Sequence, residues 1–227
     1  MNEDFSKLLS PFQFPVSGIQ VDNRIVMAPM TTFSGNEDGT VSDDELSYYK
    51  ERNRGAGLLI SACAYVTPQG KAFPGQFSAY SDDMLPSLKR LAAALKENGG
   101  KAVLQIHHGG RMCPPELVPG GEPLSASAVA PVREGAVTPR EMTELEIEET
   151  IAAYGEAARR AVEAGFDGVE IHGANTYLIQ QFFSPHSNRR TDKWGGSLEK
   201  RMTFPLAVVD AVKAAVKKAS DRPFIIG

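Results

Sequence analysis

A short run of residues, from His172 to Tyr177, holds side chains that could polarise a carbonyl group and deliver a proton. His172 and Asn175 are three positions apart, so a helical turn between them would point both donors toward a single oxygen. Tyr177 adds a phenol, which stays protonated at neutral pH because its ordinary pKa is about 10. A buried histidine beside a helix-capping asparagine would explain the same pair, and by itself the pair favours that structural explanation.

Other candidates stand where apolar runs of the sequence end. Gln105 could bond neighbouring backbone, or it could donate to and accept from the edge of a heteroaromatic ring. Cys63 and its alanine neighbours could pack closely in a barrel wall, or they could let a flat cofactor lie against the backbone with Thr31 at its edge. The remaining histidines lack carboxylates at metal-ligand spacing, so the sequence predicts no metal site.

These candidates follow short apolar runs that alternate with longer amphipathic segments. Each run is rich in valine, isoleucine or leucine and apolar on both faces, which is typical of a strand buried in a parallel sheet. The predicted strands are 25–30, 58–64, 102–107, 168–172 and 224–226. The predicted helices are 43–53, 82–98, 144–164 and 197–219. This alternation predicts an α/β fold, either a barrel or a doubly wound sheet.

Cap residues support the helix predictions. Ser42 precedes a run of acidic residues, which favour a helix start. Thr143 and Glu146 form a Thr-x-x-Glu capping box, and Gly165 supplies a left-handed stop. Pro205 lies inside the fourth helical segment, where it predicts a kink or a later helix start.

Two segments fall outside the strand–helix repeat. Residues 12–23 predict a small hairpin that could plug one end of a barrel. Residues 109–142 form a long excursion after the third strand, and excursions of this size are usually functional. Polar residues cluster at the strand ends, which is the edge that binds ligands in both candidate folds.

Composition narrows the classes of function. The chain has 227 residues, of which 42% are hydrophobic and 23% charged, as in ordinary soluble globular proteins. Its net charge of −4, without a dense basic run, argues against nucleic acid as a partner. We expect Cys63 and Cys113 to be reduced thiols. The acidic N-terminus and the lack of an apolar stretch of about 20 residues predict a cytoplasmic protein without membrane association.

Longer stretches of the sequence resemble the Old Yellow Enzyme family. The most specific is Ser-Pro-His-Ser-Asn-Arg-Arg-Thr-Asp-Lys-Trp-Gly-Gly-Ser at 184–197, which matches the family's signature loop almost letter for letter. The other matching stretches are 23–31, 105–111 and 168–178. The likeness runs from about residue 7 to the last residue and so covers nearly the whole chain.

The resemblance implies a (β/α)8 barrel that holds FMN without a covalent bond. Members of the family take a hydride from NADPH or NADH and pass it, through the flavin, to an activated alkene such as an α,β-unsaturated carbonyl. His172 and Asn175 would hold the oxygen of this small-molecule substrate, and Tyr177 matches the family's proton donor. Further matches imply that five residues bind the flavin: Pro29, Met30, Thr31, Cys63 and Gln105.

Length sets a competing hypothesis. The sequence predicts about five of the eight strands of such a barrel, so residues 1–227 would form the N-terminal part of a single domain without its C-terminal strands. The family binds the FMN phosphate with those strands, so we expect the chain alone to be inactive. The alternative is a non-catalytic half-barrel that folds only by pairing or swapping with another chain through its open edges, as in a homo-oligomer. A hydrolase using His172 and Glu170 is a weaker hypothesis, because no nucleophile motif or metal ligands accompany them.

Overall fold

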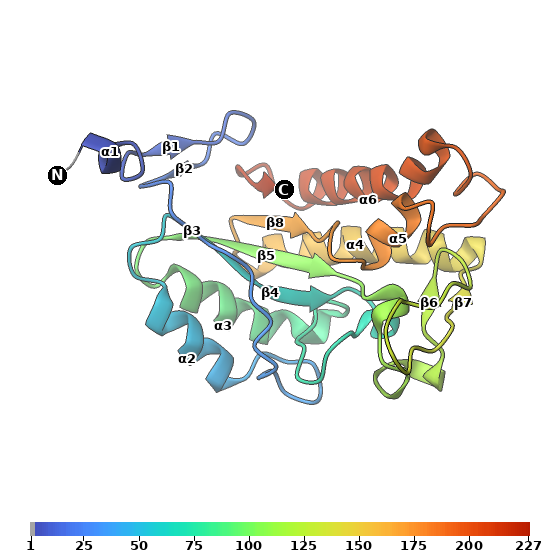
Figure 1. Ribbon diagram of the computed structural model, residues 1–227. Coiled ribbons are helices and arrows are strands. Elements are labelled where there is room, and N and C mark those ends of the chain that lie inside the picture. Colours follow the sequence, from blue (N-terminus) through green and yellow to red (C-terminus); the bar gives the residue numbers. More distant parts are fainter. Residues whose placement is uncertain (1–2) are drawn as a thin grey trace.

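A five-stranded parallel sheet forms the centre of the molecule, and its strand order follows the chain (Figure 1). The computed structural model describes residues 3–227. The strands, in order across the sheet, are β3 (Val26–Met27), β4 (Leu58–Tyr65), β5 (Lys101–His107), β8 (Gly168–Ile171) and β9 (Ile225–Ile226). In a doubly wound sheet the order of the strands across the sheet reverses at a switch point, whereas here each strand lies beside the strand of this sheet that precedes it in the chain. Of the two predicted architectures, the structure therefore has the barrel winding, with five strands of it.

Helices cover one face of the sheet and connect its strands. They are α2 (Asp43–Arg52), α3 (Leu85–Lys96), α4 (Glu144–Ala164) and α6 (Leu198–Ala219), with the shorter α1 (Glu3–Ser6) and α5 (Leu178–Phe183). The main core lies between these helices and the strand residues that face them, such as Leu59, Leu104 and Val169. Among the described residues, no helix has the length and apolar character needed to cross a membrane.

The helix ends follow the predicted caps. The Ser42 hydroxyl accepts from the Glu45 backbone N–H at 3.0 Å, and Gly165 has a left-handed φ of 90°. Both bonds of the capping box at the start of α4 are present. The helix predicted over 82–98 is shorter, because Asp82–Met84 forms a 3-10 turn before α3 begins.

The structure corrects two sequence predictions, namely a later start of the fourth helix and a first strand over 25–30. The helix α6 starts at Leu198 and continues through Pro205, because Phe204 and Val208 on its buried face are fully enclosed. Packing of that face, including a ring stack of Phe204 on Phe182, outweighs the missing proline N–H. The first strand is confined to Val26–Met27 instead of 25–30, since a proline soon after it cannot donate to a ladder.

The opposite face of the sheet has an apolar layer below a polar one. Ile60 on β4 pairs with Val103 on β5, and Val103 pairs with Gly168 on β8. The buried side chains of this layer pack with the hairpin β1 (Phe12–Gln13) and β2 (Gln20–Val21), through Phe12, Phe14 and Ile19. The hairpin within 12–23 therefore closes the inner face at the N-terminal side of the strands.

A β-bulge in β4 decides which residue points into the polar layer. The register shifts between Ile60 and Cys63, so that Cys63 stands opposite Gln105. An unbroken ladder would have placed Ala62 there instead. Two side chains replace the interrupted backbone bonds: the Tyr49 hydroxyl accepts from Ala62 N–H at 2.6 Å, and the Ser61 hydroxyl accepts from Gln105 N–H at 3.2 Å.

The excursion 109–142 packs beside the carboxyl ends of the strands (Figure 1). It contains three 3-10 turns, Gly110–Met112, Pro115–Leu117 and Pro119–Gly121, and the parallel pair β6 (Leu124–Ser125) and β7 (Arg140–Glu141). Gln181 ties the excursion to α5, because its amide oxygen accepts from Arg111 N–H and from the Ser125 hydroxyl.

Candidate active site

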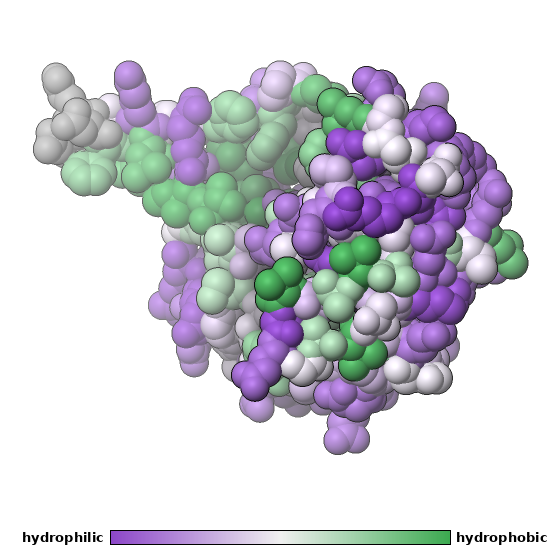
Figure 2. Space-filling view, turned by 45° about the vertical axis from the view of Figure 1, so that its right-hand side comes forward, coloured by the Kyte–Doolittle hydropathy of each residue, from purple (hydrophilic) through white to green (hydrophobic). Residues whose placement is uncertain are grey.

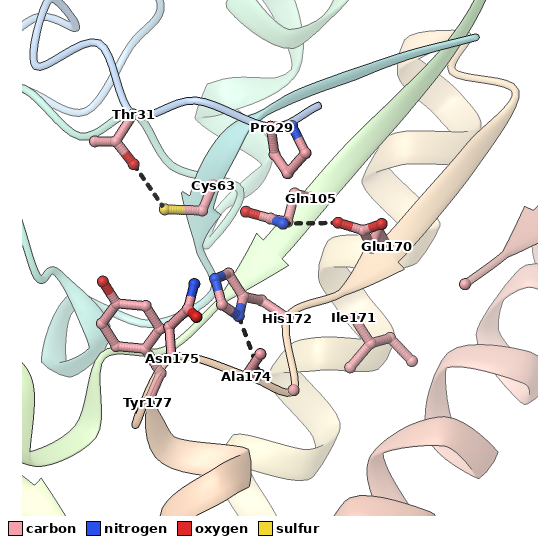
Figure 3. A pocket seen from close by; sticks show the side chains of 12 residues that line it. Pro29, Thr31, Cys63, Gln105, Glu170, Ile171, His172, Ala174, Asn175 and Tyr177 are labelled. Carbon is pink, nitrogen blue, oxygen red and sulfur yellow. Dashed lines mark hydrogen bonds between the residues drawn. The ribbon is translucent and has the colours of Figure 1, made fainter. Parts of the chain in front are cut away.

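A cavity of about 440 Å³ opens where the strands end (Figure 3). Seven of the eight residues predicted from the sequence line it: Pro29, Thr31, Cys63, Gln105, His172, Asn175 and Tyr177. The eighth, Met30, does not line the cavity, and its side chain is 59% exposed. The structure thus brings together residues that are up to 148 positions apart, from Pro29 to Tyr177. Their roles remain predictions.

The polar layer forms one wall of the cavity. Gln105 donates from Nε2 to Glu170 Oε1 at 2.7 Å, which fixes the orientation of its amide group. Its Oε1 then stays available to accept a hydrogen bond within the cavity. The sequence named Glu170 only in the weaker hydrolase hypothesis and not among the flavin-site candidates. Its position two residues before His172 was the signal that both side chains face the cavity.

Cys63 is held as a neutral thiol at the bulge. Burial raises its pKa to about 11, and the Thr31 hydroxyl lies 3.7 Å from its sulfur. The amide of Gln76 donates to the Cys63 carbonyl oxygen at 3.0 Å and also lies 3.3 Å from the sulfur. Gln76 was not among the sequence candidates, because it comes from a loop without a motif. A neutral thiol here presents a small surface to a ligand and no charge.

The geometry of the His172 loop differs from the helical turn expected from the sequence. Asn175 and Thr176 have left-handed φ values of 55° and 65°, so the chain reverses sharply after β8. Figure 3 shows the side chains of both His172 and Asn175 at the cavity. Asparagine adopts this conformation more readily than most residues, which explains its presence there.

His172 is a neutral hydrogen-bond donor. Burial lowers its pKa, and the nearby Glu170 carboxylate opposes this only in part. Its Nδ1 accepts from Ala174 N–H at 3.4 Å, so the neutral ring carries its proton on Nε2. The Tyr177 ring meets the His172 ring edge-on at 5.0 Å, and burial raises the pKa of the Tyr177 phenol. Both groups therefore keep their protons at neutral pH.

His107 is a further polar group beside this loop, and the sequence candidates did not include it. Its ring lies 4.4 Å from the Tyr177 ring, and its Nδ1 is 3.2 Å from Gln76 Nε2. Burial holds the pKa of His107 well below its ordinary range, and its Nε2 has no partner. Within residues 3–227, no group of three or more potential ligands is placed to hold a metal ion.

The winding of the sheet and the site at its carboxyl ends define the class: part of a β/α-barrel with its ligand site at the usual edge. The model of the NADH:flavin oxidoreductase / NADH oxidase family matches residues 7–225. The chain therefore belongs to this family, which is the Old Yellow Enzyme family of the sequence resemblance.

Known relatives agree with this assignment. The chain is 53% identical to a probable NADH-dependent flavin oxidoreductase of Bacillus subtilis, covering 100% of the chain and 60% of that protein. It is 54% identical over 211 residues to an NADH:acrylate oxidoreductase of Vibrio harveyi, covering 93% of the chain and 21% of that protein. A structure of morphinone reductase with tetrahydroNAD superimposes with a TM-score of 0.84 at 32% identity, covering 96% of the chain and 62% of that structure. The chain spans about 60% of the Bacillus relative's length.

FMN is the cofactor of this family, and the cavity fits its ring system. Its volume lies within the usual range for small-molecule sites, and Gln105 Oε1 is placed to accept from a ring N–H. Cys63 and Pro29 give a small, uncharged surface for a flat ring. No lysine or arginine lines the cavity among the described residues, so these residues fit the ring and leave the phosphate to other groups.

Proposed function

We propose that the protein containing this chain is an FMN-dependent oxidoreductase that uses NADH or NADPH to reduce an activated alkene, such as an α,β-unsaturated carbonyl compound. One observation carries the proposal: neutral His172 and Asn175 line the same cavity as the protonated Tyr177 phenol. The relative named NADH:acrylate oxidoreductase supports this substrate class, because acrylate is an alkene activated by a carboxyl group.

FMN, when bound, would supply the hydride-transfer chemistry between the nicotinamide and the alkene. The residues of this chain bind and orient both partners. Gln105, fixed by Glu170, would accept from the flavin ring, and Thr31 would contact its edge beside Cys63. These contacts would hold the ring against the wall that the bulge creates.

His172 and Asn175 would hold the electron-withdrawing oxygen of the substrate. His172 Nε2–H and the Asn175 amide N–H are both donors, and negative charge develops on that oxygen as the alkene is reduced. A neutral imidazole can fill this role, because it still carries one N–H, here on Nε2, at neutral pH. One such donor is worth about 3 kcal/mol in the transition state.

Tyr177 would deliver the proton to the neighbouring carbon. The raised pKa of its phenol keeps the proton in place until the substrate becomes basic enough to take it. His107 packs edge-on against the Tyr177 ring and helps to fix its position.

The experiment replaces both donors in the full-length protein, as His172→Ala with Asn175→Ala. We expect the variant to purify with bound flavin and a normal absorbance spectrum, while kcat for alkene reduction falls by more than 1,000-fold, about 4 kcal/mol or more. Asn36→Ala, in an exposed loop outside the cavity, is the matched control and should retain full activity. Persistent turnover in the double variant would show that these residues do not polarise the substrate. A full-length protein that binds no FMN would overturn the whole proposal.

A second candidate function, pairing of this half-barrel with another chain, is supported by a separate observation. Figure 2 shows hydrophobic side chains gathered over the N-terminal segment and hairpin. The exposed apolar residues of this region include Phe5, Leu8, Leu9 and Val26, which are 40–56% exposed. Light scattering of the 227-residue chain tests it: a stable dimer without FMN supports pairing, and a soluble monomer refutes it.

A further inference from the structure

A second, smaller cavity of about 130 Å³ lies beside the active-site loop. It is lined in part by Arg111, from the turn after β5, and by Thr176, which stands between Asn175 and Tyr177 in the chain. No described residue lines both cavities, so this one is separate from the site discussed above.

Arg111 is a buried cation without an acidic partner. Its side chain is only 7% exposed, and no carboxylate of the described residues forms an ion pair with it. Its Nη1 donates to the carbonyl oxygens of Val129 and Ala130 at 3.1 and 3.2 Å. Its Nε is buried and makes no hydrogen bond. Burying a charge in this way is costly unless an opposite charge compensates it.

The rest of the cavity lining offers donors and no acid. Gln180 uses its Oε1 to accept from Thr176 N–H at 2.6 Å, which leaves its amide N–H groups free. Ser184 contributes a hydroxyl and His186 an imidazole, whereas the Ser187 hydroxyl already donates to the Gln181 carbonyl oxygen at 2.9 Å. An arginine that lines one cavity together with amide and hydroxyl donors is a usual recognition set for carboxylates and phosphates.

We propose that this cavity binds a single small oxyanion group, either a carboxylate or a phosphate, against Arg111. Its volume is less than a third of that of the first cavity, which suits one such group and excludes a whole nucleotide. The anion would supply the negative charge that is missing beside the Arg111 guanidinium. Because Thr176 borders the cavity, the anion would also contact the loop that carries the proposed substrate donors. The proposal does not depend on the proposed redox activity.

The test measures anion binding to the full-length protein by isothermal titration calorimetry and thermal melting. Inorganic phosphate and acetate are the two probes, at constant ionic strength set with sodium chloride. We expect one saturable site per chain for at least one probe. Binding of acetate alone assigns the site to carboxylates, and binding of phosphate alone assigns it to phosphates. If neither probe binds saturably at up to 50 mM, the proposal is wrong.

Three variants locate the binding. Arg111→Met should weaken it at least tenfold, whereas Arg222→Met should not, because Arg222 also bonds only carbonyl oxygens but lines neither cavity. Arg111→Met also removes two structural hydrogen bonds, so a second variant that keeps Arg111 and these bonds is needed. Ser184→Asp places a carboxylate in the cavity, and we expect it to abolish binding of added anions with an equal or higher melting temperature. Unchanged anion binding in Arg111→Met or in Ser184→Asp would overturn the proposal.

Discussion

Replacing Tyr49 with phenylalanine tests whether the bulge in β4 turns Cys63 toward the cavity. The change removes one hydroxyl from a fully buried side chain and alters almost no volume. That hydroxyl is the 2.6 Å acceptor for the Ala62 backbone N–H, which the shifted register leaves without a ladder partner. Ala62 is 3% exposed, so water cannot easily replace the bond. A buried N–H without an acceptor costs about 1–3 kcal/mol.

We therefore expect Tyr49→Phe to lower the free energy of unfolding of the full-length protein by about 1–3 kcal/mol. Urea denaturation should show a lower midpoint with an unchanged slope. We also expect weaker FMN binding, measured by flavin fluorescence, because a relaxed bulge would move Cys63 away from Gln105. Tyr48→Phe is the matched control: Tyr48 is the neighbouring, partly exposed tyrosine, and its loss of a hydroxyl should cost less than about 0.5 kcal/mol.

Comparison of the two tyrosine variants can contradict either the stabilisation of the bulge or its effect on the cofactor site. Equal denaturation midpoints for Tyr49→Phe and Tyr48→Phe would show that the hydroxyl does not stabilise the bulge. Lower stability with unchanged FMN affinity would show that the bulge is stabilised as described but does not shape the cofactor site.

Three further predictions concern the thiols, the histidines and the cofactor. Burial raises the pKa of Cys63 to about 11 and that of Cys113 to about 12. We therefore expect iodoacetamide at pH 8 to label neither thiol in the native protein and both in denaturant. Detection of either labelled cysteine by mass spectrometry of the native protein would contradict this. Burial lowers the pKa values of His107, His108 and His172, and that of His108 falls to about 3. The folded state therefore favours the neutral imidazoles, so their contribution to stability is complete above pH 6.5 and is lost as the pH falls below 6.5. The melting temperature should be level from pH 8 to 7 and should fall between pH 6.5 and 5; a level curve down to pH 5 contradicts this. We expect the 227-residue chain alone to lose FMN on gel filtration, since no lysine or arginine of residues 3–227 lines its cavity. Co-elution of one FMN per chain would refute that expectation.

Local sequence patterns predicted the elements and most of the cavity lining. The apolar runs marked all five strands because buried parallel strands need apolar side chains on both faces. Their polar ends then had to meet, since parallel strands share one carboxyl edge. The limits of these elements were less predictable. The course of α6 through Pro205 depends on the packing of Phe204 against Phe182, and no local pattern contains that contact.

The orientation of Cys63 could not be predicted either. Alternation along β4 counts every residue, and it would place Ala62 on the inner face with Ile60. The extra residue of the bulge is stable only because Tyr49, on a helix 13 positions earlier, accepts the Ala62 N–H. A pattern within one strand carries no information about that partner, so alternation alone left Cys63 and its neighbours equivalent, and only the family resemblance singled out Cys63.

His172 and Asn175 both line the cavity, as their spacing predicted, although the predicted helical turn between them does not form. A helical turn was the expected link, but the chain there takes left-handed conformations, and Thr176 is β-branched, so its φ of 65° is strained. Two glutamines of α5 hold it: Gln180 accepts from Thr176 N–H at 2.6 Å, and Gln181 donates to the Thr176 carbonyl oxygen at 2.7 Å. Because Gln181 also bonds Gly109 and Arg111 after β5, the loop is tied to the neighbouring strand as well as to its own helix. The cost of the strain is therefore offset by bonds outside the cavity, which leaves the His172 Nε2–H and the Asn175 amide free for a ligand.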